Sequence, residues 1–268
     1  ASAAGLILGH LIGITVATVM ISFIVVRRSH PHIRSWLRSV RNWDSIKTQL
    51  VTYSKFPRYS IWADLINSSG SQLPIIILSA QFSVAIGGLY FMALRIGNTP
   101  ATVVAESLGK AYLSKAAAAL RSGHLRANTR IFFRLLLGIS IVPYVLIALM
   151  VPVLVPFLFG EQWIDAGKYL VYLSPWIFSV FLVAPLTILY SVLGWQEEEL
   201  RFQFILFVGR VSIILFPIIG YSASTTILLF SLVSGFIYIF HGVRILLRVS
   251  IRSSQITSDM RKEVKASI

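Results

Sequence analysis

The chain has 268 residues, of which 56% are hydrophobic and 13% charged, and its mean hydropathy is +0.78. This composition is typical of an integral membrane protein and excludes an ordinary soluble globule. The chain has no cysteine, which excludes disulfides and cysteine-ligated metals, and its net charge of +14 gathers in short loops beside apolar segments, which argues against nucleic-acid binding.

Seven segments are each long and apolar enough to cross a bilayer, which takes about 20 residues. They cover residues 5–26, 58–80, 84–109, 131–157, 169–193, 202–220 and 223–247. We therefore predict an all-α, polytopic membrane helical bundle with about seven transmembrane helices.

The basic residues predict the orientation of these helices. Of 24 lysines and arginines, 21 lie on one side, in the segment 27–58, the loop 110–134, the turn 195–201 and the tail from 244. Basic loops stay in the cytoplasm, so we expect the N-terminus outside and the C-terminus inside. Residues 32–50 space Trp and aliphatic residues between arginines, which predicts a basic amphipathic helix on the cytoplasmic membrane surface. It serves as a connector or, alternatively, as a binding site for acidic headgroups.

The second span has a polar stripe. Ser60, Asp64, Asn67 and Ser71 follow one another at helical spacing on one face. Pro74 removes the hydrogen bond that the carbonyl of Gly70 would accept, which predicts a loosened helix there. A helix in lipid keeps polar residues on a face that meets protein or a wet cavity, so we expect this helix to line a transport pathway.

The third span repeats this pattern, with Pro100 inside it. Its stripe consists of Arg95, Asn98, Thr102 and Glu106. At about 1.5 Å per residue, Arg58 lies level with Glu106, whereas Arg95 lies deeper than Asp64. We therefore expect an Arg58–Glu106 pair and an Arg95 that is left to meet an anion. The alternative, which is favoured for Ser60, Ser68 and Thr102, is that these groups only join helix to helix.

Other polar and aromatic groups have simpler interpretations. Arg210, eight residues into its span, is expected to reach the cytoplasmic surface, the carboxylates of Glu197, Glu198 and Glu199 are expected to be solvated, and Trp176 belongs to an expected interfacial aromatic belt. No arrangement of catalytic residues, phosphate-binding glycine loop or metal-spaced histidines is present in the sequence. We therefore predict no catalytic residues, metal or cofactor, and a protein that is not an enzyme.

Two stretches resemble a known family. In GLYFMALRIGNTP the chain has the pattern G-x-Y-x-x-A-x-R followed by a proline, and the preceding FPRYSIWADLINSSGSQLP also matches. The second stretch covers residues 159–196. Its residues that match the family pattern are Phe159, Gly160, Trp163, Ala166, Gly167, Tyr169, Pro175, Pro185, Leu193, Gly194 and Gln196. Over residues 50–200 the chain resembles the bacterial polysaccharide flippases of the Wzx type, in the multidrug/oligosaccharidyl-lipid/polysaccharide superfamily.

The resemblance implies two six-helix lobes around a central cavity. Residues 1–26 would be the last helix of the first lobe, 27–57 a basic linker, 58–247 the second lobe and 248–268 a basic cytoplasmic tail. Because the chain begins without Met at the head of a helix, we expect it to be part of a longer protein. The implied activity is the movement of a polyprenyl-diphosphate-linked oligosaccharide across the bacterial inner membrane for surface polysaccharide biosynthesis.

The same resemblance implies roles and partners. Arg58 and Arg95 would hold the diphosphate or acidic sugars, whereas Asp64 and Asn67 would bind hydroxyls or a coupling cation. The partners would be the lipid-linked oligosaccharide, membrane lipids and other polysaccharide-assembly proteins. The alternatives are a multidrug or cation exporter of the same superfamily, a membrane glycan polymerase or ligase, for which the outer loops are short, and a purely structural protein.

Overall fold

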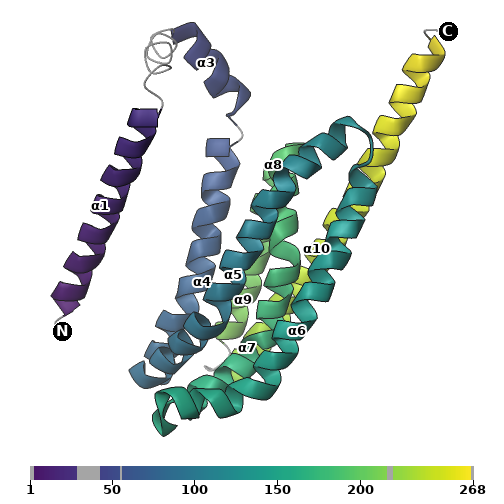
Figure 1. Cartoon of the computed structure of the whole chain (residues 1–268). Helices are drawn as coiled ribbons and strands as arrows, with labels where there is room; N and C mark the ends of the chain where they lie inside the picture. Colours follow the sequence, from purple (N-terminus) through teal and green to yellow (C-terminus); the bar gives the residue numbers. More distant parts are fainter. Residues whose placement is uncertain (1–2, 29–42, 55, 216–219, 267–268) are drawn as a thin grey trace. The chain divides into compact units, whose positions relative to one another are not determined.

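A computed structural model describes residues 3–28, 43–54, 56–215 and 220–266 of the chain (Figure 1). The chain forms two units, one up to Ser54 and the other from residue 55 onward. The first unit contains α1 (Ala3–Arg28), which covers the first predicted span, and α3 (Trp43–Thr52). Of the predicted amphipathic helix at 32–50, residues 32–42 lie outside the described residues, and α3 covers the rest.

The second unit is built from helices alone in the residues that the structure describes. Its long helices are α4 (Ile61–Gln81), α5 (Val84–Arg121), α6 (Leu125–Phe159), α7 (Ile164–Val183), α9 (Gln196–Ile214) and α10 (Ala223–Ala266). Short elements join them: the π-helical turn η1 (Phe56–Ser60), the 3₁₀ turns η2 (Glu161–Trp163) and η3 (Ala184–Thr187), and α8 (Ile188–Leu193). The predicted all-α membrane bundle is confirmed, and a helix lies at each of the seven predicted spans.

Helix α7 lies at the centre of this unit, where it packs against α5, α6 and α10 (Figure 1). Small residues allow these close approaches, as is usual between membrane helices. A Cβ atom on Gly97 of α5 would lie 2.3 Å from Leu170 of α7, and one on Gly235 of α10 would lie 3.3 Å from the carbonyl oxygen of Pro175. Helix α4 packs instead against α9 and α5. The α4–α9 pair therefore forms a second layer beside the α7 core.

Three segments of the described chain are long and apolar enough to cross a membrane by themselves: Leu125–Ile147, Glu161–Leu193 and Ala223–Ile251. Helices α4, α5 and α9 are not among them. These three helices carry polar residues within their spans, which lowers their hydropathy. As shown below, those polar residues gather around one cavity.

The prolines of α4 and α5 do not end these helices, and the predicted loosening at Gly70 stays a prediction. Both helices continue through their prolines, Pro74 and Pro100. A proline inside a helix removes one backbone hydrogen bond, and both helices continue on either side of it. The α-helical run is interrupted at Pro185, in η3, where α7 gives way to α8.

Candidate functional site

A polar cavity of about 350 Å³ lies inside the second unit, between α4, α5, α7, η3 and α9, with Tyr238 of α10 also on its wall. Its lining residues are Asp64, Asn67, Ser71, Asn98, Thr102, Ala105, Glu106, Gly109, Lys110, Trp176, Val180, Ala184, Thr187, Ile188, Glu199, Phe202, Gln203, Arg210 and Tyr238. A volume of this size lies within the range of ligand-binding pockets.

Six of the nine residues predicted for the site lie on this cavity. Helix α4 contributes Asp64, Asn67 and Ser71, and helix α5 contributes Asn98, Thr102 and Glu106. Three residues of each stripe, inferred separately from helical spacing, thus belong to the wall of the same space. Their role in substrate binding stays a prediction.

The other three predicted residues are not among those that line the cavity. Arg58, on η1, is exposed and its guanidinium lies 5.5 Å from the centre of the Tyr59 ring. Arg95 is also exposed, with its guanidinium 5.0 Å from the ring of Phe91 one turn earlier in α5. Ser60, which ends η1, is half-buried. Roles for these three residues in binding the cargo remain predictions as well.

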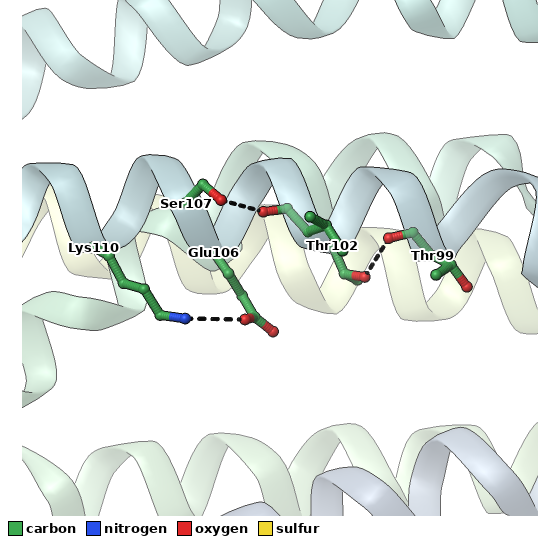
Figure 2. A network of polar contacts seen from close by, with 6 residues as sticks. Thr99, Thr102, Glu106, Ser107 and Lys110 are labelled. Carbon is green, nitrogen blue, oxygen red and sulfur yellow. Dashed lines mark hydrogen bonds and ion pairs between the residues drawn. The ribbon is translucent and has the colours of Figure 1, made fainter. Parts of the chain in front are cut away.

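The expected pair between Arg58 and Glu106 is not formed. Glu106 instead forms an ion pair with Lys110, one turn further along α5, with 3.5 Å between the Nζ and Oε2 atoms (Figure 2). On the same helix the hydroxyl of Thr102 donates to the carbonyl of Thr99 at 2.9 Å. Both partners of the Glu106–Lys110 pair line the cavity. Glu106 is therefore paired within α5, and Lys110 adds a positive charge that the prediction lacked.

The buried cation of the cavity is Arg210. The expectation that its side chain reaches the cytoplasmic surface is wrong, because the residue is only 2% exposed. The guanidinium lies 5.0 Å from the ring of Trp176, 5.7 Å from that of Phe230 and 5.9 Å from that of Tyr238. Aromatic faces attract cations at such distances, and more strongly where water is excluded.

Two further contacts fix Arg210. Its Nε atom donates to the hydroxyl of Ser234 at 3.4 Å. On the α4 side, a Cβ atom at Gly70 would lie 3.4 Å from its Nη1 atom. Gly70 therefore leaves space for the guanidinium. Among the described residues, none of the ion pairs includes Arg210.

Polar atoms around the cavity are left unpaired. Asn98 Oδ1, Trp176 Nε1 and Gln203 Oε1 are buried and have no hydrogen-bond partner in the described part of the protein. A buried polar group without a partner is costly. The two unpaired acceptors favour a ligand with hydrogen-bond donors such as hydroxyl groups, whereas the Trp176 donor and the Arg210 charge favour acceptor or anionic groups on the same ligand.

The end of the bundle that carries Arg201, Arg244 and Arg248, called the basic end below, also holds carboxylates. Glu199 lines the cavity ahead of the predicted span 202–220, and burial together with the charge of Asp64 raises the pKa of its carboxyl to about 7. Glu198 pairs with Arg248 and, at 3.9 Å, with Arg244. The expectation that these acids are solvated is therefore wrong for Glu198 and Glu199, because α4 and α10 pack against the start of α9.

Sequence reasoning missed the contribution of α9 and of Trp176. Trp176 is buried on α7 beneath Arg210 and does not lie in a surface belt. The α9 residues had a readable signal: Glu199, Gln203 and Arg210 stand at i, i+4 and i+11, the same stripe spacing that identified α4 and α5.

Comparison with known proteins adds an independent finding. A family described as "Polysaccharide biosynthesis protein" matches residues 1–168 of the chain. No curated protein and no solved structure matched the chain. Because the family match covers more than half of the 268 residues, the chain belongs to this family of polysaccharide biosynthesis proteins.

Proposed function

We propose that the protein is a flippase that carries a polyprenyl-diphosphate-linked oligosaccharide from the inner to the outer leaflet of the bacterial cytoplasmic membrane. On this proposal it is a transporter and not an enzyme, its C-terminus is cytoplasmic, and the second unit from residue 55 onward serves as one lobe of the transport pathway. The cargo would serve the biosynthesis of a surface polysaccharide, in agreement with the family.

The observation that carries the proposal is the desolvated guanidinium of Arg210 beside unpaired polar atoms in a membrane bundle. Arginine binds phosphate oxygens through two parallel hydrogen bonds and keeps its charge when buried. The diphosphate of a lipid-linked sugar presents such oxygens. We therefore assign the diphosphate, or an acidic sugar, to Arg210.

The remaining lining suits the sugars. Asn67, Asn98 and Gln203 offer amide donors and acceptors for hydroxyl groups, and the ring of Trp176 offers an apolar face. Pockets that bind polar ligands combine apolar walls with a few placed polar groups in this way. Arg58, exposed on η1, is proposed to meet the headgroup outside the cavity.

The test is a deletion followed by complementation. Loss of the gene is expected to trap lipid-linked oligosaccharide in the cytoplasmic leaflet, as measured by the accessibility of the sugar to an enzyme added from outside. The wild-type gene is expected to restore the outward movement, and the Arg210→Ala gene is not. Normal sugar exposure in the deletion strain would overturn the proposal.

A second candidate, an exporter of small cations, is favoured by the carboxylates. Asp64 and Glu199 both line the cavity at the basic end, and the ion pairs among the described residues include neither. Ion-driven efflux of an organic cation from vesicles that contain the purified protein, lost in Asp64→Asn, would support this function. The buried Arg210 repels such a cargo, which is why we place it second.

A further inference from the structure

The outer side of the α4–α9 pair has a groove that the cavity does not include. Its volume is about 610 Å³, and it is lined by Trp62, Ile66, Leu200, Arg201, Phe204 and Ile205. Arg201 is the one charged residue of this set; the others are apolar. The groove is therefore an apolar trough with a cation at one end.

The cavity and the groove occupy two faces of the same two helices. On α9 the cavity takes Glu199 and Gln203, whereas the groove takes Leu200 and Phe204. Neighbouring residues of a helix point about 100° apart, so these pairs lie at equal depth on different faces. The groove and the carboxylate end of the cavity are thus separated only by the thickness of the helix pair.

The depth of the groove follows from its residues. Arg201 lies close in sequence to Glu198, which pairs with Arg244 and Arg248, so it belongs to the basic end. Tryptophan and arginine are typical of the level of the lipid headgroups. From there Phe204 and Ile205 continue one turn deeper along α9. The trough therefore runs from headgroup level into the hydrocarbon.

The groove is open in the second unit. Trp62 is 56% exposed, Phe204 57% and Ile205 53%. An apolar occupant that enters this groove from the hydrocarbon of the membrane moves between two apolar surroundings, which gives no hydrophobic gain. Selection of an occupant must therefore come from shape and from the charge of Arg201. An isoprenoid chain that ends in a phosphate complements both: its apolar, branched chain packs on the apolar lining, and its phosphate pairs with a guanidinium.

We propose that this groove is a loading site for the polyprenyl phosphate part of the lipid-linked cargo, which docks with its chain against Trp62 and Phe204 and its phosphate at Arg201. This inference rests on the proposed function, and it places the cargo beside Glu199 before the headgroup enters the cavity and meets Arg210. An ordinary phospholipid has a phosphate too, but its paired acyl chains lack the methyl branches.

Photolabelling of the full chain tests the inference. The protein is placed in nanodiscs of phosphatidylcholine with a short polyprenyl phosphate that carries a diazirine in its chain, irradiated, and mapped by mass spectrometry. We expect labelling on the groove residues of α4 and α9. Unlabelled polyprenyl phosphate should compete, and an equal amount of phosphatidylglycerol should not.

Matched variants sharpen the result. Ile205→Trp fills the groove and Arg201→Gln removes its charge, and each is expected to lower labelling at least fivefold. The controls are Leu247→Trp, an exposed residue of α10 (60%), and Arg134→Gln, an exposed arginine of α6, which should stay within twofold of the wild type. All variants are first checked for a monodisperse, folded peak in size exclusion.

Three results would overturn the inference: equal labelling of α6 and α10, competition by phosphatidylglycerol as strong as by polyprenyl phosphate, or unchanged labelling in folded Ile205→Trp. The proposed function fails separately, through the deletion strain. Groove labelling without trapped oligosaccharide in that strain would uphold a polyprenyl phosphate site and reject the flippase. Arg210-dependent translocation without groove labelling would uphold the flippase and reject the polyprenyl phosphate site.

Discussion

Arg95 and Arg210 are both arginines within predicted membrane spans, yet the structure treats them in opposite ways. Arg95 is exposed and contacts Phe91 of its own helix. Arg210 is buried among rings of α7 and α10 and beside Gly70 of α4. Helical spacing finds polar faces, but the neighbouring helices decide which arginine enters the cavity.

The difference has an energetic side. A charged residue at the centre of a membrane helix costs about 2.5–3.5 kcal/mol on insertion scales. A desolvated cation–π contact returns up to about 2 kcal/mol, and Arg210 has three aromatic neighbours. Such a site can hold a guanidinium without a carboxylate, and this leaves its charge for an anion.

The largest expected effect is that of Arg210→Ala. A hydrogen bond to a charged group contributes about 1.5–3 kcal/mol, so translocation of the lipid-linked oligosaccharide in proteoliposomes should fall about tenfold to a hundredfold. Arg210→Lys keeps the charge but not the two parallel hydrogen bonds of a guanidinium. Its translocation rate should lie between those of the wild type and Arg210→Ala. Arg95→Ala is the matched comparison, and its loss is expected to be smaller than that of Arg210→Ala because Arg95 is not among the residues that line the cavity. A larger loss in Arg95→Ala than in Arg210→Ala would reverse the comparison.

The second effect concerns the space that Gly70 leaves for Arg210. A Cβ atom there would touch Nη1 at 3.4 Å, so Gly70→Ala should be tolerated, whereas the branched side chain of Gly70→Leu should push the guanidinium aside. We expect a several-fold lower translocation rate for Gly70→Leu in the same vesicles. Gly88→Leu on α5, where a Cβ atom meets nothing within 4 Å, controls for the added leucine. Equal loss in both leucine variants would refute the packing argument.

How far the sequence predicts this molecule can be seen on particular helices. Hydropathy placed each long helix, and the stripes of Asp64 and Asn98 correctly indicated polar faces, because a 3.6-residue period is a local property. The position of Arg210 was predicted wrongly because the aromatic rings around it belong to Trp176 and Tyr238, which are far from it in sequence. Glu198 and Glu199 were misjudged for the same reason: their neighbours are on α4 and α10.

The third effect is a pH dependence of stability that arises from Glu199 and involves neither Arg95 nor Arg210. The pKa of its carboxyl rises from 4.5 to about 7 on folding, so the folded protein binds more protons than the unfolded one between these values. The free energy of unfolding therefore falls as the pH rises through this window and is level above it. Glu199→Gln lacks this loss, and its unfolding midpoint should gain a few °C on the wild type between pH 5 and pH 8.

Thermal unfolding in detergent measures this difference, with Glu197→Gln, an exposed neighbour, as the control. Asp64→Asn should reduce the effect, since the charge of Asp64 contributes to the raised pKa of Glu199. If the midpoint of Glu199→Gln differs from the wild type by the same amount at both pH values, the carboxyl does not change its proton binding on folding.

The smallest effect on stability is expected from Glu198, the residue before Glu199. Glu198 joins α9 to α10 through Arg244 and Arg248, whose side chains are 41% and 42% exposed. Exposed ion pairs contribute about 0–1 kcal/mol, so Glu198→Gln should lower the unfolding midpoint only slightly, and less so at high salt. Translocation should not change, because Glu198 is not among the residues that line the cavity. A loss of transport in Glu198→Gln comparable to that in Arg210→Ala would mean that the α9–α10 contact at the basic end, and not the buried cation, governs the pathway.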